Sequence, residues 1–294
     1  MAFHPVSDVA SVREACERAR FKGQRVGFVP TMGALHAGHL ALVVEARRRS
    51  GFVVASIFVN PTQFGPGEDF ARYPRDLDGD LRMLASAGAD MVFAPDALEI
   101  YPPGEKTRVH VSSLTAGLEG ALRPGHFDGV TTVVAKFFAI VGPCVAVFGR
   151  KDYQQLAVVR RMARDLMFPV DIIGHAIVRD PDGLAMSSRN RYLSPDERRR
   201  ALSLSRGLDS ALGLFERGER DARALERVVI ESIVAAHVDV DYVKATDTES
   251  LSPILGSVST TALLSVACRF GSTRLIDNVV LGEDRAPLVA ARET

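Results

Sequence analysis

The sequence predicts an α/β protein of two domains: a parallel-sheet domain at residues 1–182 and a smaller α+β domain with an antiparallel sheet at residues 183–294. Three observations lead to this prediction. Apolar runs typical of strands alternate with helix-periodic segments in the first part of the chain, as in βαβ units. After Asp182, three strand-like runs follow one another without intervening helices, which indicates antiparallel pairing. A chain of 294 residues is also long enough for about two domains.

The first domain is predicted to hold a Rossmann-like parallel sheet. The run Phe52–Val59 is unbroken, and only a strand covered on both faces tolerates that. The expected elements are, in order, a strand at Val26–Thr31, a helix at Gly38–Arg49, the strand Phe52–Val59, a helix marked by Leu77, Leu81 and Leu84, a strand at Asp90–Ala94, a helix at Val130–Val141, a strand at Val145–Phe148, a helix at Tyr153–Leu166 and a strand at Val170–Ile173.

The second domain is predicted to begin near Asp180–Ser188. Ser194-Pro195-Asp196-Glu197 is a capping box with proline at the first helical position, so a long helix starts there. The remaining expected elements are a helix from about Ala222 to His237 and strands at Val240–Ala245, Ala262–Arg269 and Arg274–Val280.

Charge balance, the lengths of apolar runs and cysteine spacing disfavour nucleic-acid-binding, membrane-spanning and disulfide-rich proteins. Lysine plus arginine and aspartate plus glutamate both number 36, so the formal net charge is zero, which predicts no general attraction for nucleic acid or an anionic membrane. The longest apolar run, Phe137–Phe148, is shorter than the roughly 18 residues of a membrane span. Cys16, Cys144 and Cys268 form no CxxC pair, so we expect buried free thiols in a cytoplasmic protein.

The most informative segment is Pro30–His39, which leaves the carboxyl end of the first strand and enters a helix, where α/β sheets bind ligands. Gly33 and Gly38 allow close approach to the backbone, and the helix start adds N–H donors. His36 and His39 are three residues apart, so both rings can offer N–H groups to a transferring phosphate. The alternatives are two surface histidines, or a zinc pair that lacks a third ligand nearby.

Two further segments carry candidate anion-binding groups. Lys151 stands at a strand–helix junction in a chain with only five lysines, which weakly indicates a point charge for an anion. Asp152 fits the N-cap of the following helix, and Gln155 lies one turn further on. The segment Met186–Asn190 combines hydroxyls with Arg189 and suits phosphate oxygens, although a polar linker has the same composition. Asn60–Pro74 is long enough for a lid or for a plain surface excursion.

Together these segments resemble the pantoate–β-alanine ligase (pantothenate synthetase) family. The HxGH element at Pro30–His39 is shared with a wider nucleotidylyltransferase superfamily and with class I aminoacyl-tRNA synthetases, so it names only a superfamily. The other matching stretches narrow it to one enzyme family. These are SIFVNPTQFGPGEDFARYPRD at Ser56–Asp76, RPGHFDGVTTVV at Arg123–Val134, FGRKDYQQL at Phe148–Leu156, DGLAMSSRNRYL at Asp182–Leu193 and, more loosely, Thr273–Asn278.

The resemblance implies a two-step ligation. Pantoate attacks the α-phosphate of ATP, and β-alanine then displaces AMP from the pantoyl adenylate, with Mg²⁺ carried by the ATP phosphates. The implied catalytic residues are His39, as proton donor, with His36, Lys151 and Arg189. Gln63 and Gln155 would bind pantoate, with Gln63 also near β-alanine. The implied ATP-site residues are Pro30, Met32, Gly33, Ala34, Leu35, His36, Ala37, Gly38, His39, Gly149, Arg150, Lys151, Asp152, Val178, Met186, Ser187, Ser188 and Arg189.

The resemblance also implies a homodimer through the first domain and a second domain that closes over the ATP site. One departure concerns Arg150, where the family usually has glutamate or lysine. Three other functions stay open from the residues alone. They are an adenylyltransferase that stops after nucleotidyl transfer, a tRNA synthetase, which the short neutral chain disfavours, and a catalytically silent nucleotide-binding regulator.

Overall fold

The computed structural model describes residues 4–288, and the chain divides into two compact units. Unit 1 comprises Met1–Arg150 and Gln154–Ala176, and unit 2 comprises Lys151–Tyr153 and Ile177–Thr294. The short Lys151–Tyr153 segment therefore groups with unit 2, although its neighbours on both sides in the sequence belong to unit 1.

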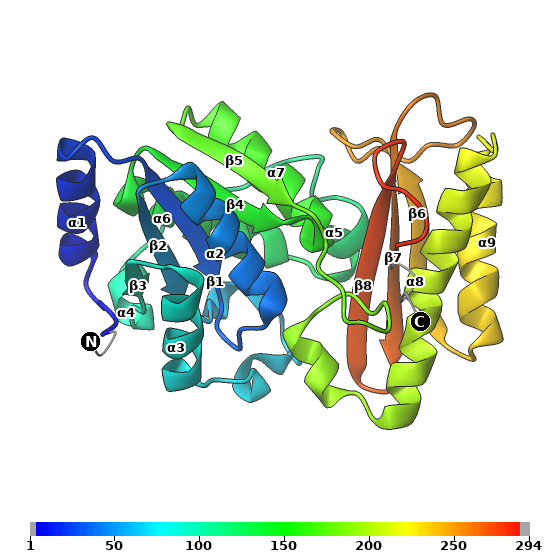
Figure 1. Ribbon diagram of the computed structural model, residues 1–294, viewed down its shortest axis with the longest axis horizontal. Helices are drawn as coiled ribbons and strands as arrows, with labels where there is room; N and C mark the ends of the chain where they lie inside the picture. Colours follow the sequence, from blue (N-terminus) through cyan, green and yellow to red (C-terminus); the bar gives the residue numbers. More distant parts are fainter. Residues whose placement is uncertain (1–3, 289–294) are drawn as a thin grey trace. The chain divides into compact units, whose positions relative to one another are not determined.

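Unit 1 is built on a five-stranded parallel sheet in the order β3-β2-β1-β4-β5 (Figure 1). The strands are β1 Val26–Thr31, β2 Phe52–Ile57, β3 Met91–Phe93, β4 Cys144–Gly149 and β5 Val170–His175. The predicted parallel sheet is thus confirmed. The direction of strand order reverses between β1 and β4, and open α/β sheets bind ligands at the carboxyl ends of the strands at such a point.

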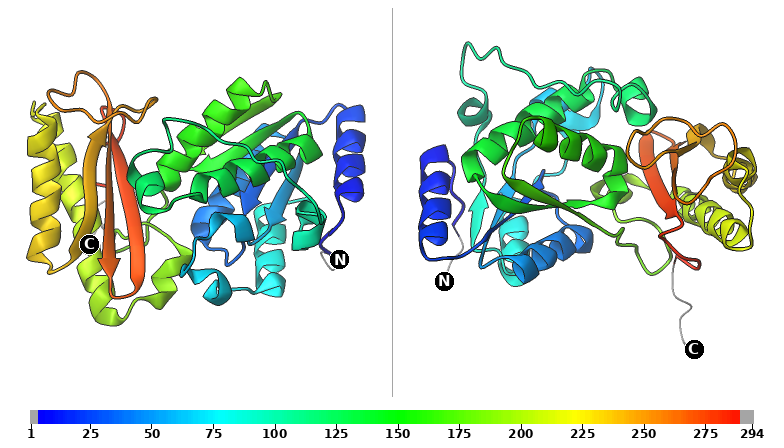
Figure 2. Two further views of the ribbon diagram at one scale, coloured as in Figure 1. Left: turned by 180° about the vertical axis from the view of Figure 1, so that it is seen from behind. Right: turned by 90° about the horizontal axis from the view of Figure 1, so that it is seen from above.

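Helices cover both faces of this sheet. On one face α2 (Ala37–Arg49) and α3 (Leu77–Ala87) pack on Val29, Val53 and Val145 of the strands. On the other face lies α6 (His126–Val141) (Figure 2). Its Phe137 meets the ring of Phe28 edge-on, with centroids 5.8 Å apart. The remaining helices of unit 1 are α1 Val9–Phe21, α4 Ala97–Ile100, α5 Leu118–Leu122 and α7 Tyr153–Asp165, with the 3₁₀ turns η1 Pro61–Gln63 and η2 Asp69–Arg72. The 3₁₀ turn η3 Arg150–Asp152 lies mostly in unit 2, which also includes the first residue of α7.

Four helices differ from the sequence prediction, which includes neither of the short helices α4 and α5. Helix α1 was not predicted, because its polar residues dilute the apolar pattern of Val12, Ala15, Cys16 and Ala19. Helix α6 begins at His126, four residues before the expected start at Val130. Gly125 has a left-handed backbone (φ +79°) that starts the helix there, and His126 and Phe127 are buried in its first turn.

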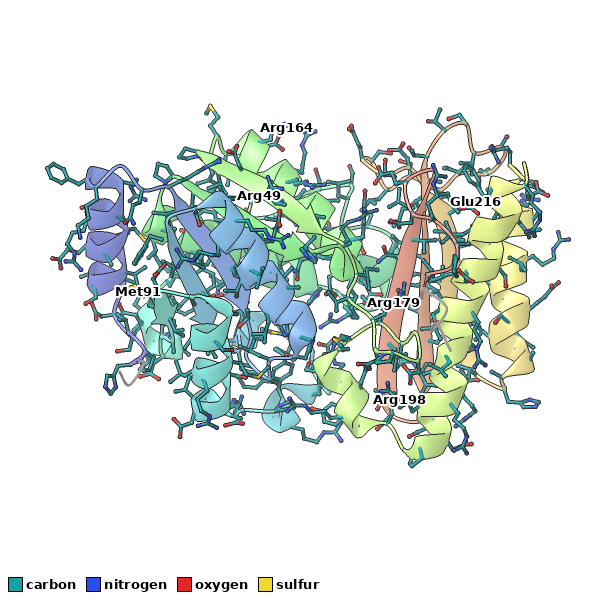
Figure 3. All side chains as sticks on the ribbon, in the orientation of Figure 1. Arg49, Met91, Arg164, Arg179, Arg198 and Glu216 are labelled. Atoms are coloured by element: carbon teal, nitrogen blue, oxygen red, sulfur yellow. The ribbon has the colours of Figure 1, made fainter. Side chains whose placement is uncertain are left out.

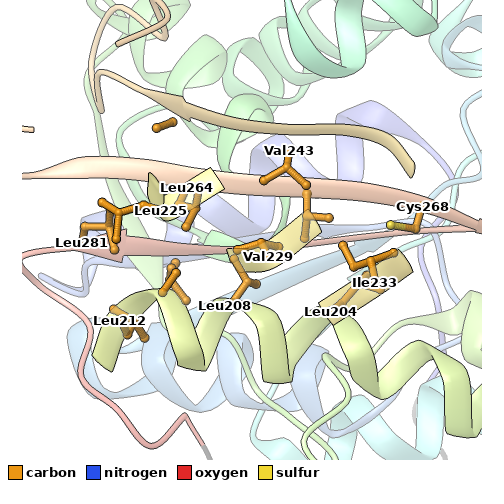
Figure 4. Packing of buried hydrophobic residues seen from close by; sticks show 14 of the residues in the cluster. Leu204, Leu208, Leu212, Leu225, Val229, Ile233, Val243, Leu264, Cys268 and Leu281 are labelled. Atoms are coloured by element: carbon orange, nitrogen blue, oxygen red, sulfur yellow. The ribbon is translucent and has the colours of Figure 1, made fainter. Parts of the chain in front are cut away.

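Unit 2 contains a three-stranded antiparallel sheet in the order β6-β7-β8, as predicted. Two helices pack on one face of it, with Leu204, Leu208 and Leu212 from the first and Leu225, Val229 and Ile233 from the second (Figure 4). Gly207 allows the helices to approach closely, since a Cβ there would lie 3.1 Å from Val229 Cα. The elements are α8 Pro195–Glu216, α9 Ala222–Ala235, β6 Asp239–Thr246, β7 Ala262–Phe270, β8 Thr273–Leu281 and the 3₁₀ turn η4 Ser188–Tyr192.

The start of α8 follows the predicted capping box. Ser194 Oγ accepts the Glu197 N–H at 3.2 Å, and a Glu197 carboxylate oxygen accepts the Ser194 N–H at 2.8 Å. Each bond satisfies a donor that the first helical turn leaves without a partner. The helix therefore begins at Pro195 as expected.

The three cysteines are free and buried, as expected. Burial raises the pKa of the Cys16 thiol to about 11 and those of Cys144 and Cys268 to about 12. The thiols are therefore protonated and weakly nucleophilic at neutral pH. Among residues 4–288 no helix is both long and apolar enough to cross a membrane.

Candidate active site

The segment that follows β1 forms a tight left-handed turn. Gly33 and Ala34 both have positive φ angles, +79° and +51°. Thr31 fixes the beginning of the turn, because its Oγ1 accepts the Gly33 N–H at 3.2 Å and donates to the Ser56 carbonyl of β2 at 2.6 Å. The turn is thus tied to the neighbouring strand before the chain enters α2.

A buried carboxylate on α3 holds the rest of this turn. Asp80 is 3% exposed, and its two oxygens accept the Ala34 N–H at 2.9 Å and the Leu35 N–H at 2.8 Å. A Cβ on residue 33 would lie 2.8 Å from Asp80 Oδ2, so glycine is required there for the carboxylate as well as for the backbone angle. The Ala34 and Leu35 amides therefore bind this protein carboxylate.

The turn delivers His36 and His39 to the start of α2. His36 is the N-cap, and the two half-buried rings lie with centroids 4.0 Å apart and planes tilted by 35°. The His36 N–H donates to His39 Nδ1 at 3.4 Å. A ring that accepts at Nδ1 carries its proton on Nε2, so Nε2 is the nitrogen of His39 that can donate.

Gln63 lies in the long loop after β2 and is held by Asn60. The Asn60 side chain is buried, and its Nδ2 donates to Gln63 Oε1 at 3.2 Å and to the Gly129 carbonyl of α6 at 3.1 Å. Tyr101 Oη donates to Asn60 Oδ1 at 2.8 Å. Gln63 Nε2 in turn lies 2.8 Å from Met32 Sδ, so this loop reaches the turn that follows β1.

The first turn of α6 anchors the same loop. The Gln63 carbonyl accepts a hydrogen bond from His126 Nδ1 at 2.8 Å, while Arg123 Nη1 donates to His126 Nε2 at 3.1 Å. Arg123 also binds both oxygens of Glu68, at 2.8 and 2.7 Å. A Cβ on Gly129 would lie 2.3 Å from the Thr62 carbonyl oxygen, so glycine is needed where α6 crosses the loop.

Burial and the charge of Arg123 determine the protonation states of His126 and Glu68. Burial and the charge of Arg123 lower the pKa of His126 to about 4, so the ring is neutral at pH 7. Burial alone would raise the pKa of Glu68, but the hydrogen bonds and charge of Arg123 hold it below its ordinary value. A neutral His126 and an ionised Glu68 allow Arg123 to bond to both.

The next candidate residues follow β4. Gly149 and Arg150 lie in unit 1, and a Cβ on Gly174 of β5 would lie 3.3 Å from the Arg150 stem, which therefore runs along that strand. On α7, Gln154 is buried and donates to the Leu114 and Gly117 carbonyls at 2.8 and 2.9 Å. Gln155, the candidate pantoate residue, is half-buried beside it.

The other candidate residues belong to unit 2. Val178 accepts the Met186 N–H at 3.0 Å across a short hairpin. Ser187 is the N-cap of η4, where its Oγ accepts the Arg189 N–H at 3.3 Å. The side chains from Val178 to Arg189 that sequence analysis selected are half-buried. The candidate site residues that belong to unit 2 are Lys151, Asp152, Val178, Met186, Ser187, Ser188 and Arg189.

Most of the candidate site residues belong to unit 1. They are Pro30, Met32, Gly33, Ala34, Leu35, His36, Ala37, Gly38, His39, Gln63, Gly149, Arg150 and Gln155. Within it the structure brings His36 against His39 and Gln63 against Met32. In residues 4–288 no three His, Cys, Asp or Glu side chains lie close enough together to hold a metal ion.

The residues that hold these loops have no role predicted from the sequence; they are Asn60, Asp80, Arg123 and His126. One signal for Asp80 was present: it lies three residues after Leu77 and four before Leu84, on the apolar face of α3. A carboxylate at such a position must find buried partners. Arg123 and His126 were part of a matched stretch, but nothing in the sequence places them against Gln63.

Comparisons with known proteins agree on one family. The family model described as pantoate-beta-alanine ligase matches residues 4–280. The pantothenate synthetase of Anaeromyxobacter dehalogenans is 54% identical over 280 residues, covering 93% of this chain and 96% of the relative. That of Moorella thermoacetica is 53% identical over 274 residues, covering 93% and 96%.

Solved structures are similar as well. The crystal structure of pantothenate synthetase from Thermus thermophilus has a TM-score of 0.89 at 51% identity, covering 94% of this chain and 99% of that one. The pantoate-beta-alanine ligase of Francisella tularensis, complexed with beta-gamma ATP and beta-alanine, has a TM-score of 0.77 at 31% identity, covering 96% and 99%.

Replacing Asp80 is expected to destabilise the fold. Asp80→Ala leaves the Ala34 and Leu35 amides buried without an acceptor, and should lower the free energy of unfolding by about 2–4 kcal/mol in urea titrations. Asp80→Asn retains one acceptor and should lose less. Asp78→Ala, on the exposed face of the same helix, is the matched control and should change stability by about 0.5 kcal/mol or less. Equal losses for Asp78→Ala and Asp80→Ala would contradict this role.

The free energy of unfolding should also depend on pH through His126. The pKa of His126 is about 4 in the fold against an ordinary 6.5, so between these values the unfolded chain binds a proton that the folded chain does not. Stability should therefore fall by about 3 kcal/mol as the pH drops from about 6.5 to about 4. The charged groups that face the ring are Arg123, Glu68 and Glu119.

His126→Asn tests this pH dependence. Asparagine retains an N–H donor for the Gln63 carbonyl but does not titrate, so urea unfolding at several pH values should give a flatter profile. His4→Asn, at an exposed histidine, should keep the wild-type slope. The same slope in all three proteins would show that His126 is not the titrating group.

Proposed function

The chain belongs to the pantoate–β-alanine ligase family, and we propose that the residues described above carry out the two steps of its reaction. That reaction is the ATP-dependent condensation of pantoate with β-alanine to pantothenate. A carboxylate is a poor acyl donor, so the first step must convert one of its oxygens into a leaving group. The second step then forms the amide.

In the first step, a pantoate carboxylate oxygen attacks the α-phosphorus of ATP. The bond from that phosphorus to the bridging oxygen breaks, and pyrophosphate leaves with its electron pair. Negative charge grows on oxygens that are already anionic, so catalysis depends on positioned donors. The observation that best supports this step is the paired His36 and His39 at the start of α2, where the His36 N–H donates to His39 Nδ1.

Charged and hydroxyl donors complete the proposed ATP site. Lys151 supplies a compact ammonium for the phosphates, and Arg189 a planar guanidinium that can bind two oxygens at once. Ser187 and Ser188 add neutral donors at the start of η4. The other residues proposed to line the nucleotide are Pro30, Met32, Gly33, Ala34, Leu35, Ala37, Gly38, Gly149, Arg150, Asp152, Val178 and Met186.

Mg²⁺ is proposed to enter with ATP. The candidate site is rich in cationic and neutral donors, and residues 4–288 hold no acidic or histidine cluster suited to a resident metal. Such a site fits a cation held by phosphate oxygens and water, which is the usual binding mode of Mg²⁺ in nucleotide sites. When bound, the ion would neutralise charge on the phosphates.

Gln63 and Gln155 are proposed to bind pantoate. Neutral amides suit this task, because a charged partner would compete with the phosphorus for the attacking carboxylate. The Gln63 side chain is held by Asn60, and its carbonyl by His126, so its position is fixed before substrate arrives. This arrangement supports its role in orienting pantoate for attack.

In the second step, the β-alanine amine attacks the acyl carbon of pantoyl adenylate. The bond to the phosphate oxygen breaks, AMP leaves, and the new amide nitrogen loses a proton. Water would compete with the amine, so Asn60–Pro74 is proposed to act as a lid, with Gln63 near β-alanine. The paired Arg123 and Glu68 support this, since they fasten the loop to the end of α5.

We further propose that the second domain, residues 183–294, closes over the ATP site, and that the enzyme is a cytoplasmic homodimer formed through the first domain. The decisive assay supplies ATP, pantoate and β-alanine and follows AMP and pantothenate. AMP release that depends on the amine supports the ligase. Pyrophosphate release without any need for an amine would support a nucleotidyl transferase, and no turnover would support a silent nucleotide-binding protein.

His39→Ala and Lys151→Ala are each expected to lower the turnover rate by about 10²–10³ or more, because each removes a preorganised donor to the phosphates. Steady-state kinetics measure the rate, and circular dichroism checks that the fold is retained. Lys244→Ala, at an exposed lysine of β6, is the matched control. Wild-type turnover in either His39→Ala or Lys151→Ala would count against its assignment.

Gln63→Ala should weaken pantoate binding more than ATP binding, because the amide is proposed to contact only pantoate and β-alanine. Calorimetric titration with each substrate measures both dissociation constants. Equal losses for pantoate and ATP would indicate that the substitution disturbs the whole site rather than one contact.

A further inference from the structure

Two neighbouring residues on β8 bind two of the segments proposed to hold ATP. Asp277 and Asn278 are both buried, at 2% and 4% exposure. Successive side chains of a strand project from opposite faces of the sheet, so one residue faces α8 and α9 and the other faces away from them. The sequence resemblance covered this strand only loosely and gave neither residue a role.

Asn278 binds the backbone of Lys151. Its Nδ2 donates to the Lys151 carbonyl oxygen at 2.8 Å. Lys151–Tyr153 groups with unit 2, whereas Arg150 and Gln154 on either side belong to unit 1. The hydrogen bond from Asn278 gives a physical reason for this grouping, because it ties the segment to β8.

Asp277 binds the base of the hairpin that leads into the Met186–Arg189 segment. Its two oxygens accept from Arg179 Nη1 and Nη2 at 2.6 and 3.0 Å, and the Arg179 side chain is only 8% exposed (Arg179 is labelled in Figure 3). Arg179 Nη1 also donates to the Gly183 carbonyl within the hairpin, at 3.1 Å. Arg179 pairs with Ala185 across it, and Met186 follows directly.

We propose that Asp277 and Asn278 are positioning residues that hold Lys151 and the Met186–Arg189 segment as one block for binding the ATP phosphates. The inference rests on the ATP-binding role proposed above for these segments. Neither residue needs to contact the nucleotide. Because the two side chains leave one strand in opposite directions, the strand fixes both segments relative to each other. Small displacements of such donors lower the rate of phosphoryl transfer strongly.

The experiment is a double-mutant cycle on Lys151 and Asn278. Asn278→Ala should lower kcat/KM for ATP about 10–100-fold, the loss expected for a misplaced donor. The dissociation constant for pantoate should change by no more than about twofold, since the proposed pantoate residues lie in unit 1. Combined with Lys151→Ala, Asn278→Ala should cause no more than about a further twofold loss, because it acts through Lys151.

Controls separate positioning from stability. Ser265→Ala removes a buried polar group of β7 directly opposite Asn278 and should keep wild-type kcat/KM. Thermal unfolding of each variant identifies any general loss of fold, and Asn278→Asp supplies a near-isosteric variant that lacks the donor. If Asn278→Ala and Asn278→Asp both retain wild-type kcat/KM for ATP, the inference is overturned.

The cycle also distinguishes the inference from the function on which it rests. Fully additive losses in the double variant would overturn only the positioning role of Asn278. Wild-type activity in Lys151→Ala would overturn the proposed role of Lys151 and the inference with it. For Asp277, Asp277→Asn should speed hydrogen exchange at the Met186 and Ser187 amides in the folded protein. Unchanged exchange there would contradict its role in holding the hairpin.

Discussion

The structure of the candidate site depends first on one buried carboxylate. Asp80 accepts the Ala34 and Leu35 amides and thereby stabilises a left-handed turn that is unfavourable for any residue but glycine at position 33. The turn determines where α2 begins, and so where His36 and His39 lie. Removing a charge from water is costly, and only bonds of this kind compensate for it. The position of the two imidazoles therefore depends on Asp80 of α3, a helix that contributes no candidate site residue itself.

The other loops of the candidate site are also held by buried polar side chains. Asn60 and His126 hold Gln63, and Asn278 holds the backbone of Lys151. Each of the three side chains binds through its own polar group: Asn60 from within the loop, and His126 and Asn278 from distant parts of the chain. Loops fixed in this way need little reorganisation when the substrate binds, which is the condition for strong electrostatic stabilisation of a transition state. The neutral His126 lets Arg123 bond to it and to Glu68 together.

Much of the fold was predictable because its signals are local. The unbroken apolar run at β2 and the capping box at Ser194 each depend on a few adjacent residues. The loops with candidate residues were also visible, as glycine-rich junctions after strands. The residues that hold these loops could not be predicted, because they are far from the loops in the sequence. Asp80 lies 46 residues from Ala34, and Asn278 lies 127 residues from Lys151. Pattern and propensity do not reveal such pairs; only the folded topology brings them together.

On the proposed mechanism, His39 and Lys151 both donate to the phosphates of one ATP molecule. The most direct test is a crystal structure of the chain with Mg²⁺, pantoate and an ATP analogue that cannot release pyrophosphate. We expect His39 Nε2 and Lys151 Nζ both to lie within about 3.5 Å of phosphate oxygens of the same nucleotide. A nucleotide bound to one of these groups, with the other beyond the reach of a bridging water, would contradict it.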